Sequence, residues 1–245
     1  MIERTAPSGA ARRAPIDRIG ATVLRELVDS IVVGDHLPGA TMPTEAVLSE
    51  QFGVSRTVVR ESMKRLQEKN MVTVAQGRGT TVNPRTSWNM LDPLVIEALI
   101  RHDETLSVLD DLTAARAALE AEMASAAAGG DSSDEELRAA LEAMQDSIED
   151  STAFREADVR FHHAVMAMSG NALAENIARV LVAHAIGSSR FTGHDPAHSF
   201  ELTLGEHERI VAAITEGDAD KARIAMSEHI LGSWSRRRAP EPPTA

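Results

Sequence analysis

Four ionisable side chains in the C-terminal half have the spacing of a metal site. Asp158 and His162 are four residues apart, so they share one face if this stretch is helical. His207 and His229 follow on two later segments, and each of the four lies on an otherwise apolar helical stripe. An unpaired polar group buried there would cost a few kcal/mol, which a shared metal ion would relieve. One carboxylate and three imidazoles suit zinc, with nickel or manganese as alternatives.

A simpler interpretation is that each histidine is a satisfied core or interface residue. For any one of them alone, this is the stronger interpretation. His163 points about 100° away from His162 on a helix, so we exclude it from the set. Three more histidines are set aside, the last two because they fall in a loop: His184, His194 and His198. Spacing alone leaves both interpretations open.

Helices must position these residues. Seven segments after residue 93 have apolar residues at the helical period, and breaks such as Gly129-Gly130-Asp131 separate them. The segments lie near residues 94–101, 105–128, 134–149, 152–168, 172–190, 200–216 and 219–236. No alternating strand pattern follows Val82, so the sequence predicts an all-α bundle for this part of the chain.

A second stretch with functional spacing runs from Pro43 to Val82 and has the pattern of two helices joined by a tight turn. Thr44 would cap the first helix, Gly53 would end it in the left-handed conformation, and Ser55 would cap the second. The second helix has an apolar face of Val59, Met63 and Leu66 and a polar face of Arg56, Thr57, Arg60 and Lys64. Such a helix is typical of DNA recognition in the major groove.

Two short strands flank the sequence Gln76-Gly77-Arg78-Gly79. The glycines permit positive φ on both sides of Arg78, which would put a guanidinium at the tip of a wing. For Arg78 alone, a surface hairpin with a solvated arginine is an equally good interpretation. The predicted DNA-binding residues are Ser55, Arg56, Thr57, Arg60, Gln76, Gly77 and Arg78.

Charge separates the two parts of the chain. The 245 residues carry a net charge of −12. Residues 1–86 hold 12 Lys and Arg against 9 Asp and Glu, whereas residues 87–245 hold 13 against 28. This asymmetry indicates a nucleic-acid-binding head on a body that phosphates would avoid.

The sequence has no Cys, no apolar signal core and no stretch of about 18 apolar residues, so we expect a cytoplasmic protein without disulfides.

The head resembles the winged helix-turn-helix domain of the GntR family of bacterial transcription regulators. The family's motifs are matched by Leu37–Glu45, Gly53–Arg60 and Gly77–Val82. One departure is Ala46, which stands where many members carry Arg and which predicts a different operator sequence. Because one winged domain offers little surface for specificity, we expect a homodimer on a palindromic DNA operator.

The body resembles the all-helical effector domain, called FCD, of the FadR-type branch of this family. Members often hold a metal with an Asp-x-x-x-His pair and two later histidines, which here are Asp158, His162, His207 and His229. The segment Trp88–Pro93 is similar to regulators of galactonate and other sugar-acid operons. The resemblance thus implies a ligand-responsive repressor with a bound divalent metal.

The expected effector is a small hydroxy-carboxylate or sugar acid. In an acidic body, the metal together with Arg116 or Arg190 would supply the positive centre that such an anion needs. Asn171 belongs to a segment matched by the resemblance and is added to the effector site. Glu120 would either accept hydrogen bonds from effector hydroxyls or pair with Arg116 at the surface.

We therefore predict a mostly α protein, a winged helix-turn-helix with a small β-hairpin followed by an all-α bundle. The expected parts are a flexible arm (1–17), the DNA-binding domain (18–83), a linker and connecting helix (84–104), the effector and dimerisation domain (105–236) and a disordered tail (237–245). Two alternatives are a metal-dependent hydrolase fused to a DNA-binding head and an architectural DNA-binding dimer without effector. No separate general base accompanies the predicted metal site, so we do not expect an enzyme.

Overall fold

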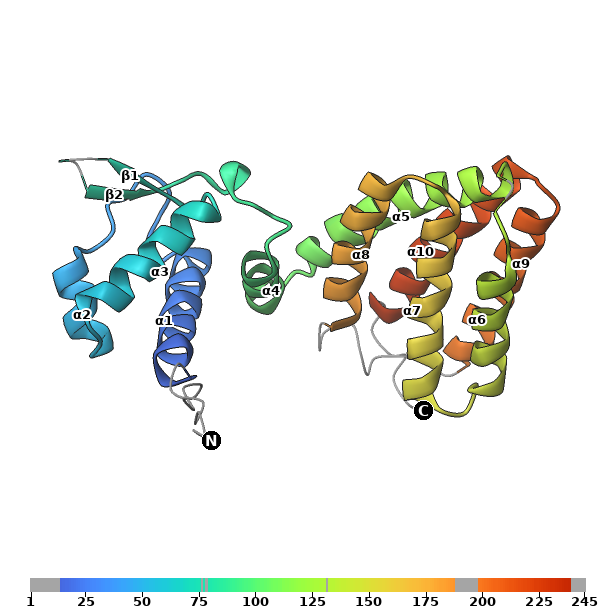
Figure 1. Ribbon diagram of the computed structural model, residues 1–245, viewed down its shortest axis with the longest axis horizontal. Helices are drawn as coiled ribbons and strands as arrows, with labels where there is room; N and C mark the ends of the chain where they lie inside the picture. The colour runs from blue at the N-terminus through green and yellow to red at the C-terminus, as the bar shows by residue number, and fades with distance from the viewer. Residues whose placement is uncertain (1–13, 76, 78, 131, 188–197, 239–245) are drawn as a thin grey trace, which may run out of the picture. The chain divides into compact units, whose positions relative to one another are not determined.

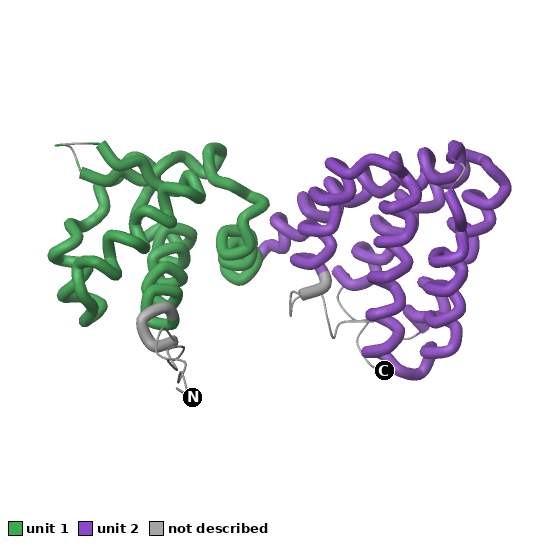
Figure 2. Tube along the Cα trace, viewed as in Figure 1, with its two compact units in different colours: residues 1–102 green, residues 103–245 purple. Residues whose placement is uncertain are grey.

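The structure is a computed structural model that describes residues 14–75, 77, 79–130, 132–187 and 198–238. The chain divides into two compact units, which we call the head (residues 1–102) and the body (residues 103–245), coloured green and purple in Figure 2. Each unit has its own core and is described by itself. The predicted arm and tail lie largely outside the described residues.

The head contains four α-helices and one hairpin among its described residues (Figure 1). In chain order these are α1 (Ala14–Val33), α2 (Glu45–Phe52), α3 (Arg56–Glu68), β1 (Val72–Ala75), β2 (Gly79–Val82), the 3-10 turn η1 (Arg85–Ser87) and α4 (Pro93–His102). Helix α1 begins at Ala14, inside the segment predicted as a flexible arm (1–17). The winged helix-turn-helix fold predicted from the sequence is confirmed.

The ends of α2 and α3 form as the sequence predicts. The Thr44 hydroxyl accepts a hydrogen bond from the backbone of Val47, and Gly53 ends α2 with φ 64°. The Ser55 hydroxyl accepts from the Val58 backbone and begins α3. The predicted apolar face of α3 is buried: Val59, Met63 and Leu66. The opposite face of α3 is therefore left to solvent.

The hairpin is a two-stranded antiparallel sheet in which Val72 pairs with Val82 and Ala75 with Gly79. Gly77 and Gly79 have φ of 75° and 86°, which confirms the positive φ predicted on both sides of Arg78. An isolated bridge joins Thr41 to β2, so the chain that precedes α2 anchors the wing. Gln76 and Arg78 themselves lie outside the described residues.

The linker and connecting helix were predicted over residues 84–104. Residues 84–102 of this segment are bonded to the rest of the head. The Asn89 backbone donates to the Lys69 carbonyl, and the Lys69 ammonium pairs with Asp92. At the end of α4, Arg101 and His102 both contact the Asp29 carboxylate of α1. The boundary between the two units therefore follows His102.

The body is helical throughout its described residues, as predicted (Figure 1). Its helices are α5 (Ser107–Ala128), α6 (Glu135–Asp146), α7 (Ser151–Met168), α8 (Ala172–Gly187), α9 (Ser199–Thr215) and α10 (Ala219–Arg238). Large side chains from α6, α7, α9 and α10 fill one core: Met144, Phe154, Phe161, Ile210 and Met226. None of the helices in the described ranges is long and apolar enough to span a membrane.

The body begins with a carboxylate cap. Asp103 accepts hydrogen bonds from the backbones of Thr105 and Val108 and from the hydroxyls of Thr105 and Ser107. Burial raises the pKa of Asp103, but these hydrogen bonds outweigh it and lower the pKa to about 2. Leu106 adopts the left-handed conformation, with φ 63°, just before α5 starts. The cap therefore holds a turn that a leucine does not favour on its own.

Candidate metal centre and DNA-binding helix

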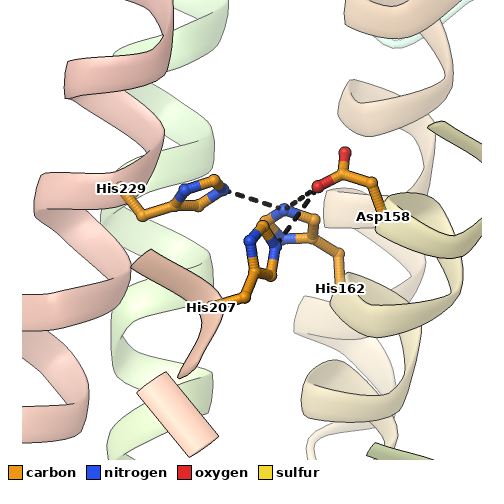
Figure 3. A group of neighbouring side chains, drawn as sticks. All are labelled: Asp158, His162, His207 and His229. Atoms are coloured by element: carbon orange, nitrogen blue, oxygen red, sulfur yellow. Dashed lines mark hydrogen bonds and ion pairs between the residues drawn. The ribbon is translucent and has the colours of Figure 1, made fainter. Parts of the chain in front are cut away.

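The fold brings the four predicted metal ligands together from three helices (Figure 3). Helix α7 supplies Asp158 and His162 on one face, α9 supplies His207 and α10 supplies His229. One ligand atom from each residue lies within 4.8 Å of all the others. The Nε2 atom of His207 is 3.2 Å from Asp158 Oδ1, and the Nε2 atoms of His162 and His229 are 3.3 Å apart.

Two atoms of this cluster are buried without a hydrogen-bond partner, namely Asp158 Oδ1 and His207 Nε2. They lie close to each other, yet within the described residues neither finds hydrogen-bonding geometry. Buried polar atoms are rarely left unpaired, so this pair requires a partner that bonds to both. A divalent cation meets the requirement, because a carboxylate oxygen and imidazole nitrogens are suitable ligands for it. The residues present therefore fit a metal ion.

Each imidazole is held by its outer nitrogen. The Nδ1 atom of His162 contacts Glu120 Oε2 at 2.6 Å, that of His207 contacts the Thr203 carbonyl at 2.7 Å, and that of His229 contacts Glu206 Oε2 at 2.9 Å. These oxygens can only accept, so each Nδ1 carries the proton and each Nε2 presents its lone pair. The three lone pairs are thus directed to one centre before any metal binds.

The electrostatics favour the metal-binding protonation state at two residues of the cluster, His229 and Asp158. Burial and the neighbouring histidines lower the pKa of His229 to about 3. Burial opposes ionisation of Asp158, but contact with the three histidines outweighs it and leaves the pKa of Asp158 well below its usual value. A neutral imidazole and an ionised carboxylate are the forms that coordinate metals.

A cavity of about 30 Å³ adjoins the cluster, with room for about two or three water molecules. Asp158, His162 and His229 line it, and so does Arg116, one of the residues predicted to bind the effector. Asn171 is not among the lining residues; it is exposed and accepts a hydrogen bond from the Ala174 backbone at the start of α8. Arg190 lies outside the described residues.

Sequence reasoning missed two carboxylates. Glu120, considered as a surface partner of Arg116 or an acceptor of effector hydroxyls, is only 1% exposed and bonds to both Arg116 and His162. Glu206 was not singled out, although it precedes His207 directly. The contacts of Glu120 with His162 and of Glu206 with His229 could not be found from spacing, because each joins two different helices of the bundle.

Comparison with known proteins identifies both units. Residues 20–82 match the family described as "Bacterial regulatory proteins, gntR family", and residues 111–232 match the "FCD domain". The chain is 30% identical over 224 residues to the "Galactonate operon transcriptional repressor" of Escherichia coli K12, covering 90% of this chain and 95% of that protein. The chain belongs to the GntR family of bacterial transcriptional regulators. It is therefore a regulator and not an enzyme, which excludes the hydrolase alternative.

One further relative and one solved structure match most of the length of this GntR-family chain. "HTH-type transcriptional regulator LutR" of Bacillus subtilis is 27% identical over 208 residues, covering 80% of this chain and 91% of that protein. A solved structure described as "Lar controls the expression of the Listeria monocytogenes agr system and mediates virulence" has a TM-score of 0.61 at 17% identity. It covers 94% of this chain and 98% of its own, and the likeness concerns the fold alone.

Helix α3 is the helix that the sequence predicts to read DNA. Its exposed face carries Arg56, Thr57, Arg60 and Lys64. Arg60 makes two hydrogen bonds to Glu45 at the start of α2, from Nε to Oε1 at 3.0 Å and from Nη2 to Oε2 at 2.8 Å. Three of its five N–H groups remain for other acceptors. Gly77 of the wing is exposed, while Ser55 is used as the cap of α3.

Proposed function

We propose that this GntR-family chain is a repressor whose operator binding responds to a small carboxylate effector at the metal centre of the body. The observation that carries the proposal is the pair of unpartnered atoms, Asp158 Oδ1 and His207 Nε2, beside a cavity that Arg116 lines. When bound, the metal would act as a Lewis acid that takes up a carboxylate oxygen. Arg116 would bind a second oxygen of the same anion.

The effector class follows from charge and from similarity. The body is strongly acidic, so a simple anion would be repelled unless a local positive centre receives it. A hydroxy-carboxylate can offer its carboxylate and hydroxyl to the metal together. The name of the E. coli galactonate operon repressor supports a sugar acid for this chain as well. Zinc is our first candidate for the metal, before nickel or manganese.

For DNA, we infer a homodimer that reads a palindromic operator. Arg56, Thr57 and Arg60 would contact bases in the major groove, and Ser55 would contact a phosphate. Arg78 would enter the minor groove, and Gln76 and Gly77 would be further DNA-binding residues. The exposed polar face of α3 supports this assignment.

The signal would pass through helix packing. The four ligands come from three helices, so completing the coordination changes how α7, α9 and α10 pack. The last turns of α10 reach the start of α5, where the Trp234 indole donates to Asp110 at 2.7 Å and Arg238 pairs with the same carboxylate. This contact lies a few residues after the boundary with the head.

A screen of zinc-loaded protein against hydroxy and sugar acids tests the proposal. A selective acid should raise the melting temperature by mass action and change the affinity for an operator obtained by selection from randomised duplex DNA. If no acid stabilises the metal-loaded protein or changes DNA binding, the architectural dimer is the better interpretation. Light scattering that finds only monomers, with and without operator, would contradict the dimer.

A further inference from the structure

Two of the candidate metal ligands are oriented by the same arrangement of three residues. An arginine bonds to a glutamate, and the glutamate bonds to the histidine; we call this arrangement a relay. In the first relay, Arg116 Nε donates to Glu120 Oε1 at 2.8 Å, and Glu120 Oε2 accepts from His162 Nδ1. In the second relay, Arg236 donates to both oxygens of Glu206 at 2.8 and 2.9 Å, and Glu206 Oε2 accepts from His229 Nδ1. The two relays thus join the same three residue types, although Arg236 bonds both oxygens of Glu206 and Arg116 bonds one oxygen of Glu120.

The relays differ in where their arginines lie. Arg116 is buried and lines the cavity beside the metal cluster, whereas Arg236 is not among the residues that line it. The Glu120 side chain is 1% exposed and that of Glu206 is 12% exposed. Only the first relay therefore joins a metal ligand to a group that an anion in the cavity can reach.

Glu120 divides one negative charge between two partners. Its two oxygens each accept one charge-assisted bond, and in a buried site such bonds polarise one another strongly. An anion that accepts hydrogen bonds from the Arg116 guanidinium weakens the hydrogen bond from Arg116 to Glu120. The carboxylate then polarises the His162 ring more strongly, which makes Nε2 a better metal ligand. When the metal binds first, it raises the affinity of Arg116 for the anion by the same factor, because coupling between sites is reciprocal.

We propose that Glu120 is a positioning residue through which anion binding at Arg116 and metal binding at His162 reinforce each other. The Glu206 relay supports the metal without this coupling. The inference rests on the metal centre of the proposed function and adds the route by which effector and metal bind cooperatively. The ligand it concerns is any small carboxylate, so acetate is a sufficient probe.

The test compares wild-type protein with Glu120→Gln and Glu206→Gln. Zinc affinity is measured by competition with a chromogenic chelator, with and without saturating acetate, and the ratio of the two affinities is the coupling factor. Both variants should bind zinc about 10–100-fold more weakly, as is usual when a carboxylate behind a ligand is lost. The coupling factor should be roughly 5-fold or more in wild type and stay within about 2-fold of that in Glu206→Gln. In Glu120→Gln it should fall by about threefold or more.

A second measurement covers the case in which Glu120→Gln does not fold. Proton–nitrogen correlation spectra of the imidazole rings in zinc-loaded wild-type protein should show the His162 Nδ1 resonance shifting as acetate is added, with a smaller shift at His229. Equal shifts at both rings, or equal coupling factors in the two variants, would overturn the inference while leaving the metal centre intact. Wild-type protein that binds no zinc would overturn the proposed metal site and this inference together.

Discussion

The head and the body place their polar chemistry in opposite environments. In the described part of the head, the arginines of α3 stand in solvent, and Ser62 is the one buried polar side chain. The body buries an arginine, a glutamate and three histidines: Arg116, Glu120, His162, His207 and His229. Of these, Arg116, His162 and His229 line the cavity. A surface for DNA can change residue by residue at little cost in stability. A buried polar site is tied to the packing of the helices that form it.

The largest expected effect is the loss of the metal from the body while the head keeps working. The double variant His207→Ala, His229→Ala removes two of four ligands from two helices, so metal analysis should find no bound ion after dialysis. The variant should also lose the effector response, whereas operator affinity in fluorescence anisotropy should stay near that of wild type. Arg236→Gln is a control that keeps all four ligands. An effector response that survives metal removal would contradict the proposal that the body senses the effector through its metal while the head binds DNA.

Acid should unfold the metal-free body before the head. The unfolded chain protonates His229 near pH 6.5, whereas the fold holds the pKa of His229 at about 3. Between these values the unfolded state binds more protons, so stability falls as the pH falls through this range, by up to a few kcal/mol. The pKa of Glu120, lowered to about 2 because Arg116 and His162 outweigh burial, adds a loss only below about pH 4.5.

Thermal unfolding of metal-free protein at several pH values, followed by a probe in each unit, measures this difference. Trp88 of the head and Trp234 of the body are the two tryptophans, so single Trp→Phe variants separate the two signals. In the described part of the head no ionisable side chain is buried. The melting temperature of the head should therefore change less between pH 7 and pH 5 than that of the body. A body transition that is insensitive to pH would contradict the neutral, buried His229.

A smaller change on α3 should affect DNA recognition and leave stability alone. Arg60→Ala should cost roughly 1–3 kcal/mol of specific binding and relax the base preference, because it removes a bidentate donor. Its surface pair with Glu45 contributes little to folding, so the melting temperature should barely move. Lys64→Ala is the matched control, because the loss of an exposed cation from the same face should weaken binding to all sequences alike. Unchanged affinity and base preference in Arg60→Ala would show that another element reads the operator.

The same contrast explains what could be predicted from the sequence. The head's turns, caps and basic face depend on residues a few positions apart, so Thr44, Gly53 and Ser55 were sufficient to predict both helix ends. The buried cluster in the body was identified because Asp158 and His162 share a helix and His207 and His229 lie on apolar stripes. The bonds from Glu120 to His162 and from Glu206 to His229 were missed, because each joins two helices that are far apart in the sequence. The attachment of residues 84–102 to the head depends on the same kind of contact, between Asp29 and the end of α4.

The smallest expected effect tests where one unit ends and the other begins. Asp103 is the first residue of the body, and its four hydrogen bonds cap the start of α5. Asp103→Ala should destabilise the body by about 1 kcal/mol, the usual cost of losing a cap, and should leave the transition of the head unchanged. Hydrogen exchange at the amide of Val108, which donates to Asp103, should become faster in the variant.

The adjacent Glu104, which is exposed, provides the control: Glu104→Gln should change neither the stability nor the exchange at Val108. The pH dependence gives a further check. Because the fold lowers the pKa of Asp103 to about 2, its contribution is present above its ordinary pKa of 3.8 and is lost as the pH falls toward 2. The difference between wild type and Asp103→Ala should therefore shrink in that range. If Asp103→Ala instead lowers the melting temperature of the head as well, the cap stabilises both units. The head and the body would then not unfold independently of each other.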